Sequence, residues 1–170
     1  MKRTITFQGN PLSLAGNAPQ AGDRAPAFTV TSQDMKDVTL ADFNGKIKLI
    51  STFPSLDTPV CDLQVKEFNK RAAGLSPDIA VIGISKDLPF AQKRFCSENN
   101  IKNETVLSDY KASSFGLSYG LLIEGLQLLA RAVLIIDKDD IVRHVQVVPE
   151  LTVPPDYDGA LKALESVIKG

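Results

Sequence analysis

Three stretches of the chain are almost continuously apolar, and they predict buried β-strands. Residues 47–53, 79–85 and 132–137 are rich in isoleucine, valine and leucine. Strands that are covered on both faces of a sheet have this composition. We therefore expect these stretches to form the core of a central sheet.

Shorter alternating segments predict further strands. Residues 3–8 and 12–15 alternate on either side of a Gly-Asn-Pro turn, which is typical of a small N-terminal β-hairpin. Short strands are expected at 28–31 and 38–40. The alternating segment 142–148 follows a turn rich in aspartate, and we expect it to pair antiparallel with the strand before it.

Segments with helical periodicity lie between and after the predicted strands. The apolar positions that mark three helices are Cys61, Val65, Phe68, Ala72 and Leu75 in the first, Leu88, Ala91 and Phe95 in the second, and Leu161, Leu164 and Ile168 in the third. Strand–helix–strand order with short connections implies a mainly parallel sheet with right-handed crossovers. A thioredoxin-like topology is one such arrangement, and the pattern alone does not distinguish it from other three-layer α/β folds.

Composition narrows the class of protein. The chain has 170 residues, 44% apolar and 23% charged, with 19 basic and 20 acidic side chains. This predicts a single domain over 1–170 and excludes an electrostatic site for nucleic acid or an anionic membrane. The sequence contains neither a secretory signal pattern nor an apolar stretch long enough for a membrane span. We expect a cytoplasmic protein with its two cysteines reduced.

Cys61 is placed where a thiolate would be favoured. It falls in the first turn of the first predicted helix, directly after a buried strand, and Pro59 suits the opening of that helix. Free N–H groups and the helix dipole favour an anion there. Thr58 offers a hydroxyl that can cap the helix or bond to the sulfur. Cys61 also lies on the apolar stripe, however, so simple core packing remains an alternative.

Other kinds of site have weaker support. His144 is the only histidine, and a lone histidine on a strand is more often structural than catalytic. The ligands for a zinc site, a Cys-x-x-Cys pair and a glycine-rich phosphate loop are all missing. The turn 137–140 is more simply explained as a solvated turn than as a calcium loop. We therefore expect neither a metal nor a cofactor.

Two motifs resemble known signatures. The segment 54–61 has Pro54, Thr58 and Cys61 in the Pro-x-x-x-Thr-x-x-Cys spacing, and it resembles the peroxidatic loop of peroxiredoxins. Its Ser-Leu-Asp-Thr-Pro-Val-Cys form is similar to the thiol peroxidase subfamily, and the segment 85–96 resembles that subfamily's second signature, which ends at the resolving cysteine. Arg131 matches the position of the active-site arginine, although an arginine at a strand start is otherwise usually a surface ion-pair partner.

The resemblance covers essentially the whole chain. It implies a thioredoxin-like α/β fold, with a central mixed sheet flanked by helices and an N-terminal β-hairpin. One segment departs from the family, because residues 120–129 are compact where its members usually have a loop. We therefore expect differences in the substrate pocket and the same chemistry.

The resemblance implies a thiol-specific peroxidase of the atypical two-cysteine type that serves antioxidant defence. Cys61 would attack hydrogen peroxide or an alkyl or lipid hydroperoxide and become a sulfenic acid. Cys96 would resolve it as an intrachain disulfide, which thioredoxin would reduce. Arg131 and Thr58 would bind the peroxide oxygens, and Pro54 would shield the site from water. A homodimer is also implied, to which apolar positions near the active-site loop, such as Leu56 and Leu117, could contribute.

A Cys61–Cys96 disulfide would require the chain to change conformation. Cys96 falls roughly two turns into its own helix, at about 3.6 residues per turn, and Cys61 begins another. A disulfide needs Cα atoms within about 7 Å, so we expect local unwinding around residues 56–65 and 88–98. Two alternatives to the peroxidase remain: a redox sensor that switches shape without turnover, and an inert α/β domain with two core cysteines.

Overall fold

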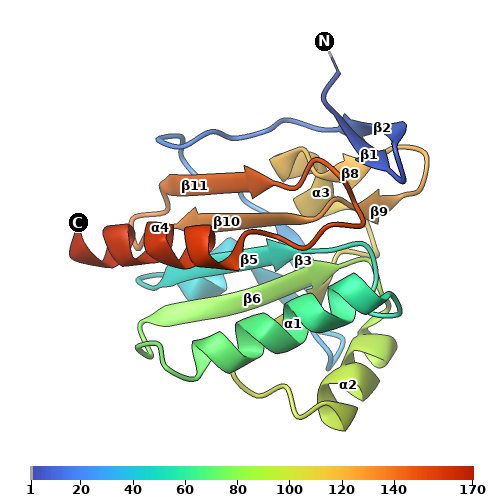
Figure 1. Cartoon of the computed structure of the whole chain (residues 1–170). Helices are drawn as coiled ribbons and strands as arrows, with labels where there is room; N and C mark the ends of the chain where they lie inside the picture. Colours follow the sequence, from blue (N-terminus) through green and yellow to red (C-terminus); the bar gives the residue numbers. More distant parts are fainter. Residues whose placement is uncertain (1) are drawn as a thin grey trace.

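A central sheet of seven strands forms the core of the protein (Figure 1). The computed structural model describes residues 2–170. In spatial order the strands are β11 (Val142–Val147), β10 (Ala132–Ile136), β5 (Ile47–Thr52), β6 (Ile79–Ser85), β7 (Thr105–Ser108), β3 (Thr29–Thr31) and β4 (Asp37–Thr39). The three predicted core strands are β5, β6 and β10, and they lie side by side in the middle of this sheet.

The sheet is mixed, and the expectation that it would be mainly parallel is wrong. β5 pairs parallel with β6, and β6 with β7, whereas β10 is antiparallel to both β5 and β11. The reason is the short helix α3 (Ser114–Tyr119), which at about 1.5 Å per residue cannot carry the chain back across the sheet. β10 therefore begins beside the end of β5, with Ala132 opposite Thr52, and runs in the reverse direction.

A second, small sheet contains the predicted N-terminal hairpin. Its order is β1 (Thr4–Phe7), β2 (Asn10–Ala15), β8 (Leu122–Ile123) and β9 (Leu128–Leu129). The compact segment 120–129 thus forms a tight β8–β9 hairpin that extends the N-terminal one. Strands of two residues are too short for alternation to identify them, so β8 and β9 were not predicted, and neither were α3 and β7.

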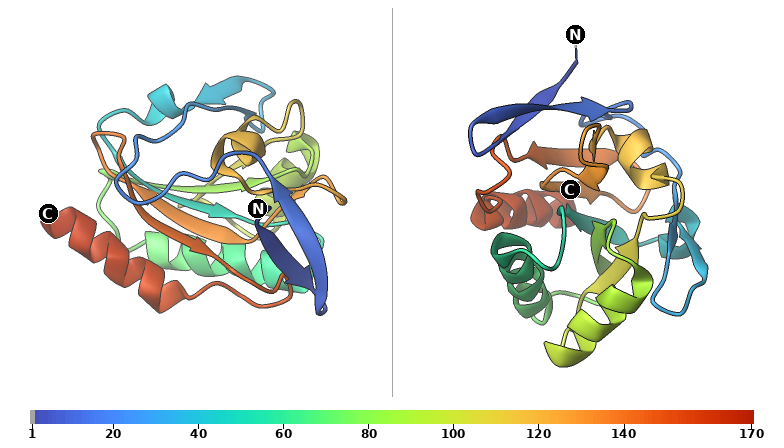
Figure 2. Two further views of the ribbon diagram at one scale, coloured as in Figure 1. Left: turned by 90° about the horizontal axis from the view of Figure 1, so that it is seen from above. Right: turned by 90° about the vertical axis from the view of Figure 1, so that its right-hand side faces the viewer.

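Helices cover both faces of the central sheet (Figure 2). α1 (Pro59–Ala72) and α4 (Tyr157–Lys169) lie on one face, with α2 (Pro89–Glu98) beyond β6. The small sheet, α3 and the short 3₁₀ helix η1 (Leu40–Phe43) lie on the other. The three helices expected from periodicity are confirmed, although Leu75 lies beyond the end of α1.

The buried faces of α2 and α4 differ from the predicted stripes. In α2 the buried residues are Pro89, Gln92 and Cys96, whereas Leu88 is 52% exposed. The Gln92 amide donates to Ser85 Oγ and to the Leu107 carbonyl, so a polar side chain fills the position where an apolar one was expected. In α4, Ala160 and Leu164 are buried and Ile168 is exposed.

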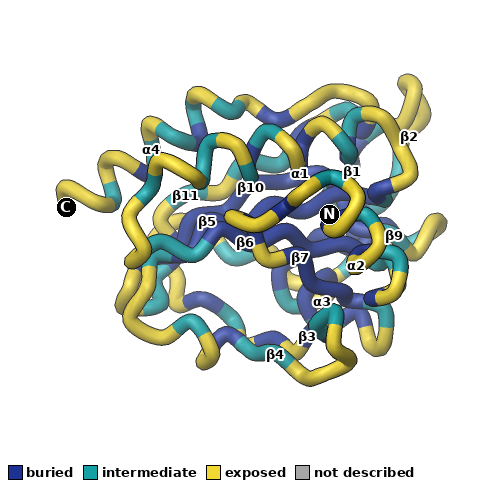
Figure 3. The backbone as a smooth tube through the Cα atoms, turned by 90° about the horizontal axis from the view of Figure 1, so that it is seen from below, coloured by how far each residue is buried: buried dark blue, intermediate teal, exposed yellow. Residues whose placement is uncertain are grey.

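The buried residues form a continuous core along the central strands (Figure 3). One cluster lies between the central sheet and the small sheet, and a second lies beneath α1 and α4. A third lies at the carboxyl ends of β5 and β6. This cysteine cluster consists of Phe53, Leu56, Cys61, Val65, Cys96, Ile101 and Val106.

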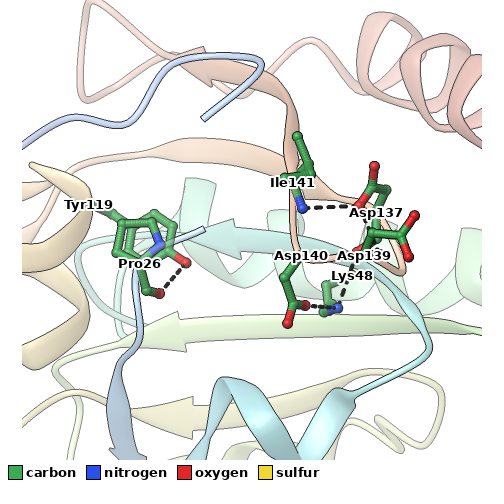
Figure 4. A network of polar contacts seen from close by, with 7 residues as sticks. All are labelled: Pro26, Lys48, Tyr119, Asp137, Asp139, Asp140 and Ile141. Atoms are coloured by element: carbon green, nitrogen blue, oxygen red, sulfur yellow. Dashed lines mark hydrogen bonds and ion pairs between the residues drawn. The ribbon is translucent and has the colours of Figure 1, made fainter. Parts of the chain in front are cut away.

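The aspartate-rich turn 137–140 is a structural feature at the opposite end of β5 (Figure 4). Lys48 is fully buried, and its Nζ donates to Asp140 Oδ1 at 2.6 Å and to the Asp137 carbonyl at 3.2 Å. Asp137 Oδ1 accepts the backbone N–H groups of Asp139 and Ile141. Residues 2–170 contain no group of side chains arranged to hold a metal ion. None of their helices has the length and apolar character needed to cross a bilayer.

Candidate active site

Cys61 lies in the first turn of α1 and is completely buried in the cysteine cluster. It is the third residue of the helix, which begins at Pro59 after the N-cap residue Thr58. The first N–H groups of a helix have no acceptor within it and carry its positive dipole end. The predicted placement of Cys61 is therefore confirmed.

Arg131 reaches Cys61 from the start of β10. Its Nη1 donates to Cys61 Sγ at 3.4 Å, and the side chain is almost fully buried. The Leu151 carbonyl accepts from its Nε and Nη2 at 3.2 and 2.8 Å. The alternative that Arg131 is a surface ion-pair partner is wrong, because no ion pair found in residues 2–170 includes it.

Gln64 also holds the Arg131 guanidinium in place, and it was not predicted as a site residue. Its Oε1 accepts from Arg131 Nη1 at 2.8 Å, while its Nε2 donates to Ser51 Oγ and to the Thr52 carbonyl. Gln64 thus ties α1 and β5 to the guanidinium. A signal was present, because a glutamine one turn after Cys61 on the buried face of a helix needs polar partners inside the protein.

Thr58 makes neither of the contacts expected of it. Its hydroxyl donates to the Ser55 carbonyl at 3.0 Å, the residue is exposed, and its side chain does not cap α1. The reason is the turn at residues 55–58, which brings that carbonyl within reach of the hydroxyl. Pro54, two residues after the end of β5, is buried as the shielding role requires.

Cys96 is buried in the same cluster as Cys61. It is the eighth residue of α2, two turns in as predicted, and both cysteines are free thiols. Gln33 Nε2 donates to its Sγ at 3.5 Å. Burial raises the pKa of the Cys96 thiol to about 11, so it is protonated at neutral pH in this conformation.

Asp87 joins the loop before α1 to the loop before α2. Its carboxylate accepts hydrogen bonds from the Ser55 hydroxyl at 2.8 Å, the Leu56 N–H at 2.9 Å and the Ser85 hydroxyl at 2.6 Å. We call this set of contacts the Asp87 clasp. Hydrogen bonds to a charged acceptor are stronger than neutral ones, so the clasp holds the segments that carry Cys61 and Cys96 together. Ser85 and Asp87 fall within the second sequence signature, but no role was inferred for them.

A groove of about 710 Å³ separates the starts of α1 and α2. Its lining residues are Leu56, Asp57, Thr58, Pro59, Asp62, Leu63, Asp87, Ala91, Arg94, Phe95, Glu98 and Asn99. Leu56 is only 5% exposed, so the expectation that it could contribute to a dimer surface is wrong for this conformation. Leu117 is exposed.

Known proteins resemble this chain in sequence and in fold. The Redoxin family model matches residues 20–161. A thiol peroxidase from Halalkalibacterium halodurans is 48% identical over 97% of this chain and 99% of its own. One from Staphylococcus aureus (strain MRSA252) is 48% identical over 96% of this chain and 98% of its own.

Solved structures agree with these relatives. A peroxiredoxin-like protein from Aquifex aeolicus superimposes with a TM-score of 0.89 at 44% identity, covering 97% of this chain and 98% of that one. A thiol peroxidase from Chromobacterium violaceum, 24% identical, gives a TM-score of 0.86 over 98% of each chain and supports the fold alone. The predicted thioredoxin-like fold is confirmed. The chain belongs to the Redoxin family, within the thiol peroxidase group of the peroxiredoxins.

Proposed function

We propose that Cys61 is the residue with which this peroxidase attacks hydroperoxides, and that Cys96 resolves the product. The observation that carries the proposal is the hydrogen bond of 3.4 Å from Arg131 Nη1 to Cys61 Sγ. A guanidinium is always charged, so this contact favours the thiolate, which is the nucleophile. The helix start at Pro59 adds to the same effect.

In the first step, the Cys61 thiolate forms a sulfur–oxygen bond and the peroxide O–O bond breaks. The leaving oxygen takes a proton and departs as water or an alcohol, while Cys61 becomes a sulfenic acid. Arg131 would donate to the peroxide oxygens as charge moves onto them. Thr58 would take part only after its hydroxyl leaves the Ser55 carbonyl, and the buried Pro54 would exclude water.

In the second step, Cys96 attacks the sulfur of the sulfenic acid. The disulfide bond forms, the sulfur–oxygen bond breaks, and hydroxide leaves with the thiol proton as water. Both sulfurs belong to the cysteine cluster. Because Cys96 is inside α2 and Cys61 inside α1, we still expect residues 56–65 and 88–98 to unwind during this step.

A reduced thioredoxin would complete the cycle. Its dithiol would attack the Cys61–Cys96 disulfide, pass through a mixed disulfide, and leave both cysteines as thiols. Sulfur supplies both electrons in this cycle, so the proposal includes no metal or cofactor. We propose an antioxidant role in the cytoplasm, for which fractionation of cells with an antibody to the chain is the direct test.

The groove between α1 and α2 supports organic hydroperoxides as substrates beside hydrogen peroxide. Leu63, Ala91 and Phe95 give it an apolar side along which an alkyl or lipid chain could lie. A homodimer is also proposed, and Leu117 and Phe90 are exposed apolar side chains that a partner copy could cover. Light scattering of the wild type and of Leu117→Glu tests it, because a dimer that uses this surface would be weakened by the charge.

The decisive assay follows NADPH consumption with thioredoxin, thioredoxin reductase and either hydrogen peroxide or an alkyl hydroperoxide. We expect turnover in the wild type and none in Cys61→Ser. Cys96→Ser should react with one equivalent of peroxide and stop at a sulfenic acid, which dimedone traps and mass spectrometry detects. Oxidation of the wild type without turnover would favour a sensor instead. Turnover in Cys61→Ser would contradict the proposal.

A further inference from the structure

The carboxyl group of Glu104 is buried without a partner beside the proposed site. Glu104 lies between α2 and β7 and is 6% exposed. Neither Oε1 nor Oε2 accepts or donates a hydrogen bond within residues 2–170. Burial raises the pKa of this carboxyl well above its usual value and so favours its protonated form. Leaving a buried polar group unpartnered destabilises the conformation that contains it.

The sheet makes room for this carboxyl. Gly83 lies in the middle of β6, and a Cβ placed on it would be 2.6 Å from Glu104 Oε1. Gly83 has ordinary strand dihedrals, so the backbone does not require a glycine. Glycine inside a strand weakens it and often marks a close approach. The approach here is that of the Glu104 side chain.

Few ionisable groups face Glu104. From α2 the nearby titratable group is Cys96, whose thiol pKa is raised by burial and lowered in part by the hydrogen bond from Gln33. On α4, Tyr157 is within electrostatic range of Glu104, and its pKa is raised chiefly by burial. From β6 the neighbour is Gly83, which carries no charge. None of the ion pairs found in residues 2–170 involves Glu104.

The backbone around Glu104 is connected to both cysteine helices. The Ile101 N–H donates to the Cys96 carbonyl at 2.9 Å, so the last turn of α2 continues into this segment. The N–H groups of Lys102 and Asn103 donate to Asn69 Oδ1 on α1 at 3.1 and 2.8 Å. Unwinding α2 at Cys96 therefore loosens the segment that keeps Glu104 inside.

We infer that Glu104 is a positioning residue for disulfide formation, which favours opening of the α2 segment because the open form returns its unpartnered carboxyl to water. The inference rests on the proposed function, in which Cys96 must leave α2 to reach Cys61. Glu104 touches no reacting atom and acts through the segment that carries Cys96.

The direction of the pH dependence follows from the two forms. In the open form Glu104 ionises above its ordinary pKa of about 4.3, whereas the closed form keeps it protonated. The closed form therefore binds more protons than the open form. Its population relative to the open form falls as pH rises from the ordinary pKa of Glu104 towards the raised one. Between these two pKa values, the ratio of open to closed protein rises by up to about tenfold for each pH unit, compared with a variant that lacks the carboxyl.

The test measures opening without peroxide chemistry. In the Cys61→Ser background, the rate of alkylation of Cys96 by N-ethylmaleimide is compared with that of Cys61→Ser/Glu104→Gln from about pH 5 to about pH 8. The ratio of the two rates cancels the titration of Cys96 itself. We expect this ratio to rise with pH, by up to about tenfold for each pH unit. A matched control, Glu165→Gln on the exposed face of α4, should leave the ratio flat.

A ratio that does not change with pH would overturn the inference. Glu104→Met, which fills the same space with an apolar side chain, gives a second comparison in case the glutamine variant folds poorly. Because Cys61 is absent, the result is independent of the proposed function. A missing Cys61–Cys96 disulfide in the oxidised wild type would overturn that function and leave the alkylation result standing. A flat ratio beside a normal disulfide would overturn the role of Glu104 alone.

Discussion

The carboxylate of Asp87 accepts a hydrogen bond from the hydroxyl of Ser55 at 2.8 Å, so the loop before α2 is bonded to the loop before α1. The Asp87 clasp adds the Leu56 N–H to this contact. The two segments proposed to separate during disulfide formation are therefore joined through a single side chain. Opening must break these bonds, and the clasp opposes the effect that we infer for Glu104.

Asp87→Asn tests the clasp. The amide retains the shape but loses the charge that strengthens three hydrogen bonds, so we expect the free energy of unfolding to fall by about 1–3 kcal/mol. Amide exchange should speed up at residues 55–58 and at the start of α2. Asp57→Asn, an exposed carboxylate on the loop before α1, is the control. Equal exchange in both variants would show that the clasp does not hold the loops.

Arg131→Lys tests the geometry of the guanidinium rather than its charge. A lysine retains the cation but cannot donate to Leu151 O, Gln64 Oε1 and Cys61 Sγ from one planar group. We expect the second-order rate of Cys61 oxidation to fall by about 10²–10³-fold. Quenched-flow mass spectrometry of the sulfenic acid measures it. The exposed Arg24→Lys should retain the wild-type rate, and an unchanged rate in Arg131→Lys would mean that charge alone suffices.

The raised pKa of Cys96 predicts a loss of stability at alkaline pH. The folded form keeps the thiol protonated to about pH 11, whereas an unfolded chain ionises it near its ordinary pKa of about 8.5. Between these two pKa values the folded state binds more protons than the unfolded state. The free energy of unfolding is therefore unaffected below the pKa of the unfolded thiol, and it falls as pH rises towards the pKa of the folded one. Urea unfolding of Cys61→Ser and Cys61→Ser/Cys96→Ser should therefore diverge above about pH 8.5. Parallel curves would contradict the burial of the thiol.

Lys48→Met separates stability from activity. The substitution removes a buried cation and the donor to Asp140 Oδ1, and leaves the Asp137 carbonyl with only the Asp140 N–H, so we expect a loss of about 1–3 kcal/mol in unfolding free energy. Peroxidase turnover at a temperature where the variant is folded should be unchanged, because Lys48 lies at the end of β5 remote from Cys61. Lys138→Met, on the exposed side of the same turn, should alter neither quantity.

Much of the fold was predictable where side chains repeat with the period of an element. The N-terminal hairpin, β5, β6, β10 and β11 follow from apolar runs and alternation, and α1 follows from its stripe. The direction of β10 did not, because it depends on how the short α3 returns the chain. The buried face of α2 was misplaced because hydrogen bonds, rather than apolar contacts, bury Gln92.

The site, like the fold, was predictable only in part. Cys61, Cys96, Pro54, Thr58 and Arg131 were all named from motifs, and the structure brings Arg131 to Cys61 as expected. Gln64, Asp87 and Glu104 were not named, because their importance lies in which atoms meet across distant parts of the chain. A carboxyl without partners, in particular, cannot be recognised until its surroundings are known.

The neutral partners of Arg131 have a consequence for the oxidised protein. Leu151 O and Gln64 Oε1 orient the guanidinium without cancelling its charge, and Cys61 Sγ accepts a further hydrogen bond from it. If Cys61 is the attacking thiolate, its sulfur is the counter-ion of Arg131, and oxidation to the neutral sulfenic acid removes that counter-ion. A buried cation without an opposite charge is strongly unfavourable. Each catalytic event would then make its own closed site less stable, so peroxide itself would trigger the rearrangement that completes the cycle.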